Sequence, residues 1–139
     1  MASDRAQLRA RRVVPALLAA YAFVHVALGG WQLISPSSFF DAVGPFGNPN
    51  SHYTRDVGTF TLALGVAFAI AYRWPAWRPG VVGYALFQYA FHAINHLADI
   101  GDADPKWVGA LDFGLLALTT PILAWTLREV LGEGRVEAP

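Results

Sequence analysis

Four long apolar stretches, separated by short polar segments, dominate the chain. They cover residues 13–33, 49–72, 79–98 and 105–127. A membrane-spanning helix needs roughly 20 mostly apolar residues, and each stretch is about that long. The pattern therefore predicts an all-α protein: an integral membrane four-helix bundle in which residues 1–139 form a single four-span domain.

The composition agrees with this membrane assignment. Hydrophobic residues make up 55% of the chain and charged residues only 14%, and the mean hydropathy is +0.36. A soluble globular domain has about 25% charged residues. The first stretch is longer than the roughly 7 to 15 apolar residues of a signal peptide, so we expect it to be retained as a span.

Basic residues are distributed unevenly between the two sides of the predicted bundle. One side carries most of them: Arg5, Arg9, Arg11, Arg12, Arg73, Arg78, Arg128 and Arg135. The other side carries only Arg55 and Lys106. Because loops rich in Lys and Arg stay in the cytoplasm, we expect both termini to be cytoplasmic and the protein to be a multi-pass protein of the plasma membrane.

One spacing of residues occurs twice, 56 positions apart. The two copies are Asn48, Pro49, Asp56, Gly58 and Asp104, Pro105, Asp112, Gly114. Asn or Asp followed by Pro is typical of a helix N-cap and the first helical position. Each copy thus predicts a helix start with an aspartate about 10 Å below it. The spacing favours, without requiring, a two-helix internal repeat.

Polar residues also recur at helical spacing within the spans. Gln88, His92, His96 and Asp99 fall on one face of the third span. In the first span, Gly29 lies one turn after His25 and would permit a close helix contact beside it. An ionisable group inside a span is costly and is by default a functional hypothesis.

These residues predict a metal site in the outer half of the bundle. Its ligands would be His25, His92, His96, Asp56 and Asp112. Histidine and carboxylate together suit zinc, iron or copper, and the absence of cysteine excludes thiolate ligands. With Asp56 or Asp99 as general base, the protein would be a metal-dependent membrane hydrolase or oxidoreductase acting on a lipid or apolar substrate from the outer leaflet.

The sequence leaves other interpretations open. His25 and His92 would serve equally as axial ligands of haem b, or as part of a quinone site, in an electron-transfer protein. A non-catalytic role in ion or proton handling, or in stabilising a membrane complex, is also compatible with the pattern. Small residues on every span are compatible with a homo-oligomer. No motif for nucleic-acid binding is present.

The second span begins with the sequence RDVGTFTLALG, at residues 55–65. With its compact four-span layout, the chain weakly resembles the DoxX-like group of small bacterial membrane proteins and their uncharacterised relatives. The resemblance implies a four-helix bundle in the bacterial plasma membrane and a loose association with redox chemistry. No family motif corresponds to His92, His96 and Asp99, so the resemblance implies no site residues.

Overall fold

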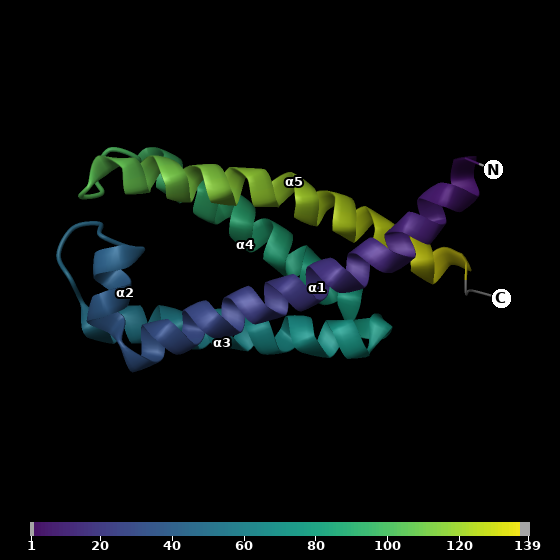
Figure 1. Cartoon of the computed structure of the whole chain (residues 1–139), viewed down its shortest axis with the longest axis horizontal. Helices are drawn as coiled ribbons and strands as arrows, with labels where there is room; N and C mark the ends of the chain where they lie inside the picture. Colours follow the sequence, from purple (N-terminus) through teal and green to yellow (C-terminus); the bar gives the residue numbers. More distant parts are fainter. Residues whose placement is uncertain (1, 137–139) are drawn as a thin grey trace.

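Helices form nearly all of the computed structural model, which describes the backbone of residues 2–136 and the side chains of residues 12–132. Four of them are long, and two short elements lie between them (Figure 1). In chain order they are α1 (Ala2–Ile34), α2 (Pro36–Ala42), α3 (Ser51–Arg73), the 3₁₀ turn η1 (Pro75–Trp77), α4 (Arg78–Ala98) and α5 (Lys106–Val136). The all-α prediction is confirmed for this part of the chain.

The helix boundaries differ from the predicted ones in four places. Helix α5 begins at Lys106, so the predicted cap residue Asp104 and the predicted first helical residue Pro105 both precede it. The cap of α3 is Asn50 rather than Asn48: its side chain accepts a hydrogen bond of 3.1 Å from the backbone N–H of Tyr53. Pro49 therefore lies outside the helix. The short α2 was not predicted, because seven residues are too few to show a helical period. Helices α1 and α5 also extend beyond their apolar stretches, to Ala2 and to Val136.

Three of the described helices are long and apolar enough to cross a membrane. They are Arg12–Ile34, Ser51–Arg73 and Lys106–Gly132. Helix α4 has 21 residues, but it carries Gln88, His92, Asn95 and His96, which lower its hydropathy.

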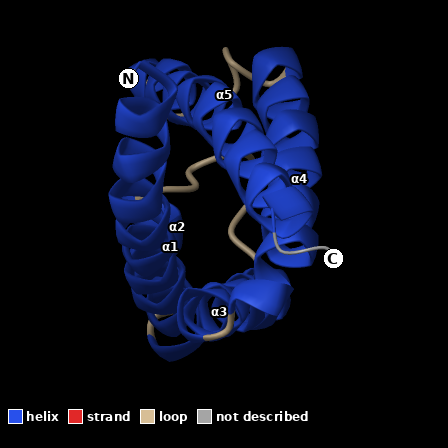
Figure 2. Ribbon diagram, turned by 90° about the vertical axis from the view of Figure 1, so that its right-hand side faces the viewer, coloured by secondary structure: helices blue, strands red, loops and turns tan. Residues whose placement is uncertain are grey.

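The long helices are arranged as two pairs (Figure 1). Helix α1 packs along α3, and α4 packs along α5, whereas the two pairs touch each other much less. Viewed from the end, the ribbons of the four long helices form a ring in which α1 is next to α3 and α4 is next to α5 (Figure 2). The first and last described residues lie at the same end of the molecule (Figure 1), as expected for four long helices that run alternately in opposite directions.

The pairs meet at the end that carries the termini, through one apolar core. Its buried side chains come from all four long helices: Val14, Leu18, Leu64, Phe68, Ala71, Val81, Val82, Ala85, Leu123 and Val130. Most of these residues are small or β-branched. The core therefore joins the pairs at this end and leaves the opposite end, where the polar residues are concentrated, without a comparable apolar contact.

Glycines allow α1 and α3 to approach backbone to backbone. A Cβ atom placed on Gly29 would lie 2.5 Å from the backbone nitrogen of Leu62, and one on Gly65 would lie 2.7 Å from that of Val26. Real Cβ atoms do not come that close to a backbone. The predicted role of Gly29 in close packing beside His25 is thereby confirmed.

At the end opposite the termini, contacts between two loops link the helix pairs. The backbone N–H of Asp104 donates a hydrogen bond of 3.1 Å to the carbonyl of Pro45. Phe46 and Ala103 form an isolated antiparallel bridge beside it. The loop before α3 is thus hydrogen-bonded to the loop before α5. Phe46, in the first of these loops, lies against the last turn of α4.

Candidate functional site

Two histidines meet on the exposed face of α4. His92 and His96 are four residues apart, and their Nε2 atoms lie 3.1 Å from each other. Gln88, one turn earlier, places its Nε2 3.5 Å from Nδ1 of His92. The predicted polar stripe is therefore present as a chain of side-chain contacts along α4. We call His92 and His96 the histidine pair.

The environment of His96 comes from both helix pairs. The ring of Phe46 stands edge-on to it, with centroids 5.0 Å apart. Asp112 on α5 is close enough for its charge to interact with His96. Nδ1 of His96 is buried and has no hydrogen-bond partner. Since buried polar atoms are normally paired, this nitrogen marks a place where the side-chain contacts are incomplete.

His25 lies in a separate place, at the contact between α1 and α4. It is 5% exposed, and both ring nitrogens are engaged. Nδ1 is 2.7 Å from the carbonyl oxygen of Tyr21, which can only accept, so Nδ1 carries the proton. Nε2 then accepts a hydrogen bond of 3.1 Å from the hydroxyl of Tyr89. The ring also packs against Phe68, at a centroid distance of 5.3 Å.

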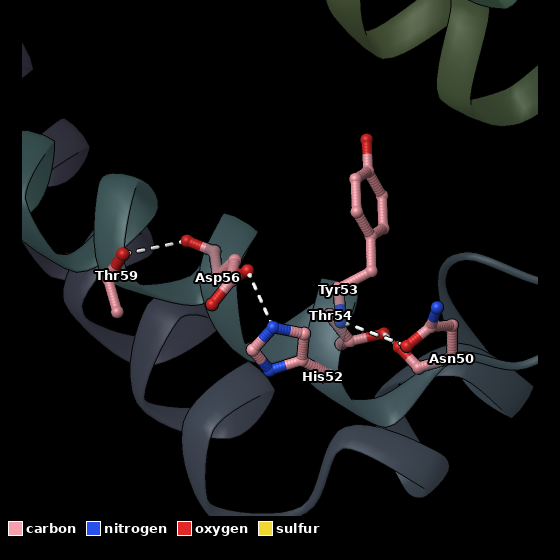
Figure 3. Close-up of polar contacts among 6 residues, drawn as sticks. All are labelled: Asn50, His52, Tyr53, Thr54, Asp56 and Thr59. Carbon is pink, nitrogen blue, oxygen red and sulfur yellow. Dashed lines mark hydrogen bonds and ion pairs between the residues drawn. The ribbon is translucent and has the colours of Figure 1, made fainter.

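Asp56 lies near the start of α3, where its carboxylate is 3.4 Å from Nε2 of His52 (Figure 3). The side chains of His52 and Asp56 are 88% and 58% exposed, so the pair is solvated. The hydroxyl of Thr59 donates to the backbone carbonyl of Asp56, at 2.7 Å. Asp56 is thus partnered within its own helix.

Asp99 follows α4 as its C-cap residue. It lines an open pocket of about 770 Å³ at the loop end of the molecule. Three carboxylates and one ammonium group are among the lining residues, which are Phe46, Gly47, Asp99, Gly101, Asp102, Ala103, Asp104 and Lys106. The pocket adjoins the histidine pair through Phe46, which contacts both.

The predicted five-residue ligand set is not brought together in this structure. Within residues 12–132, no group of three or more His, Asp or Glu side chains is close enough to hold one metal ion. His25 is bonded to the two tyrosines, Asp56 to His52, and only the histidine pair with Asp112 lies in one region. The sequence predicts which residues share one face of a helix. The distance between residues on different helix pairs depends on how the pairs pack against each other.

Two residues of this region were not singled out from the sequence. Tyr89 continues the buried stripe of Val82 and Ala85 on α4, and this spacing is the signal that it meets another helix. Phe46 lies in a loop, and no periodic signal marks it.

Comparison with protein family models, with curated proteins and with solved structures finds no match for this chain. The resemblance to DoxX-like proteins therefore stays a prediction.

Proposed function

We propose that the protein is a metal-binding membrane protein whose ion is held by the histidine pair. The observation that carries this proposal is the 3.1 Å separation of the two Nε2 atoms. Zinc–nitrogen bonds are about 2.0 to 2.1 Å long, so two imidazoles on one tetrahedral ion have nitrogens about 3.3 Å apart. The 3.1 Å contact is a hydrogen bond between the two rings, and because its length is close to the spacing of two ligands on one ion, an ion could replace it with little movement of the rings.

The remaining coordination would come from groups around His96. Asp112 on the neighbouring helix α5 would supply the carboxylate by moving closer to the pair when the ion binds, because the described side chains do not yet form a group of three ligands. Histidine with carboxylate suits zinc, iron or copper. The amide nitrogen of Gln88 lies beside Nδ1 of His92. In the metal-bound pair the amide would turn to present its oxygen, which can accept from the Nδ1 proton and hold that ring in position. We leave His25 and Asp56 out of the ligand set, because each is partnered elsewhere.

The same contacts argue against the haem interpretation. Both ring nitrogens of the buried His25 are bonded to tyrosines, Nδ1 to Tyr21 and Nε2 to Tyr89, so a haem iron would have to displace a contact between helices. In the histidine pair the two Nε2 atoms are bonded to each other, and one shared ion would replace that contact. We therefore propose the metal ion without haem.

The proposed membrane arrangement has four spans. They are the three helices that are long and apolar enough to cross a membrane, together with α4, which is the third span in chain order. Its apolar residues Phe87, Phe91 and Ile94 are all at least 60% exposed, so they would face lipid. The polar side chains of α4 would face the other helix pair rather than lipid. An ionisable side chain is tolerated there, because it does not have to be buried in hydrocarbon. Both termini would lie in the cytoplasm, on the side that carries most arginines.

A substrate would be apolar or lipid-like and would come from the side of the histidine pair. A bound zinc ion would activate water for hydrolysis, whereas iron or copper would supply redox chemistry. Of the predicted general bases, Asp99 remains the better candidate, because it lines the pocket beside Phe46. Asp56 is engaged with His52.

The direct test is elemental analysis of the detergent-purified full chain, compared with His92→Ala, His96→Ala and the control His52→Ala. We expect a stoichiometric transition metal in the wild type and in His52→Ala, and its loss in both variants of the pair. A well-folded wild type without metal would overturn the proposal, as would equal loss in all three variants. Circular dichroism of each variant confirms that it is folded.

A further inference from the structure

Arginines are concentrated at the end of the molecule that carries the termini. Each of four arginines lies within three residues of a core side chain on its own helix, so the packed core brings them to one end. They are Arg12 near Val14, Arg73 near Ala71, Arg78 near Val81 and Arg128 near Val130. Among the described side chains, the acidic residue at this end is Glu129. This end therefore carries a strong positive charge.

The turn between α3 and α4, residues 73–78, carries two of these arginines. Helix α3 ends at Arg73, and α4 begins at Arg78 after the single 3₁₀ turn η1. Nε of Arg78 donates a hydrogen bond of 3.2 Å to the carbonyl of Ala71, which ties the start of α4 to the last turn of α3. This hydrogen bond links the two ends of the turn.

Two tryptophans of this turn are exposed beside the arginines. Trp74 and Trp77 are 54% and 55% exposed. The guanidinium carbon of Arg73 lies 5.6 Å from the ring centroid of Trp74, a cation–π distance. Tryptophan prefers the level of the lipid head groups, because one part of its ring is apolar and the other can hydrogen-bond. The ring would therefore hold the guanidinium at the level of the phosphates.

We infer that residues 73–78 form a binding site for an anionic phospholipid head group, with Arg73 contacting the phosphate and Trp74 and Trp77 packing beside it. Arg12 and Arg128, both exposed at the same end, add to the local positive potential. A guanidinium can donate two parallel hydrogen bonds to one phosphate, which a single ammonium group cannot. The inference depends on the membrane arrangement but not on the metal site.

The test is native mass spectrometry of the full chain in detergent, after addition of phosphatidylglycerol or of phosphatidylcholine with the same acyl chains. We expect the wild type to retain the anionic lipid preferentially. An arginine near a membrane surface contributes about a fivefold change in affinity, so Arg73→Gln should lower the preference by about that factor. Arg55→Gln is the matched control, since Arg55 is an exposed arginine at the opposite end.

Further comparisons keep the inference falsifiable. Arg73→Lys retains the charge and should retain part of the preference, which also guards against a folding defect in Arg73→Gln. Equal retention of the two lipids by the wild type would overturn the inference, as would equal losses in Arg73→Gln and Arg55→Gln. Displacement of phosphatidylglycerol by inorganic phosphate would show a site for soluble anions and would also overturn it. Metal content should stay unchanged in every variant, which separates this result from the proposed function.

Discussion

The two helix pairs hold their histidines in opposite ways. In the α1–α3 pair, Gly29 and Gly65 stand against backbone atoms of the partner helix, and His25 is buried beside them. In the α4–α5 pair, a Cβ on Gly83 would meet the side chain of Leu127 at an ordinary contact distance of 3.9 Å, and the tight position Gly109 lies against Ile100 of the preceding loop rather than against α4. His92 is exposed. The tightly packed pair covers its polar group and satisfies it with protein contacts. The looser pair leaves two imidazoles accessible, which is what a binding site requires.

The largest expected effect comes from the core that joins the pairs. Phe68 on α3 is fully buried and packs against Tyr21 and His25. Phe68→Ala should lower the free energy of unfolding by about 3 to 5 kcal/mol, because the surroundings cannot fill the cavity. Phe60 lies on the same helix but is 71% exposed, so Phe60→Ala is the control and should change little. Denaturant titration in detergent, followed by circular dichroism, measures both; equal losses would contradict the assigned core.

Alanine at a glycine position tests the difference between the pairs directly. Gly29→Ala would place a methyl group against the backbone of Leu62 and should cost about 1 to 3 kcal/mol, because backbone atoms cannot move aside freely. Gly114→Ala meets no atom within 4 Å and should gain up to about 1 kcal/mol from helix propensity. The same denaturant titration measures the free energy of unfolding of both variants. Similar changes in the two would show that the pairs pack alike.

A smaller effect is expected for the hydrogen bond that links the pairs at His25. Tyr89→Phe removes the donor to Nε2 and should cost about 0.6 kcal/mol, the average for such bonds between membrane helices. Tyr84→Phe, on the same helix at a site 59% exposed, is the control. Metal content should be unchanged in Tyr89→Phe. Loss of the metal in this variant would mean that His25 belongs to the site after all.

The smallest effect is expected at the start of α3. His52→Ala removes the exposed pair with Asp56 and should change the free energy of unfolding by less than about 0.5 kcal/mol, because water screens both groups. A larger loss, measured by the same titration, would show that water screens this pair less than its exposed geometry implies.

The sequence determined the helices and the local relations within them. Apolar length and the helical period predicted four long helices, the shared face of Gln88, His92 and His96, and the packing role of Gly29. These features depend on backbone geometry, which repeats every 3.6 residues and needs no knowledge of other helices. The cap at Asn50 was missed because two asparagines, Asn48 and Asn50, compete at that position, and only the backbone conformation chooses between them.

Only the tertiary structure decided which polar groups meet. His25 pairs with Tyr89 and Asp56 pairs with His52, whereas the histidine pair lies near Asp112 and Phe46. Depth in a span can be counted along one helix, but the rotation and separation of helices depend on side chains from several of them at once. The glycines that bring α1 to α3, and the core that joins the pairs at one end only, set those distances.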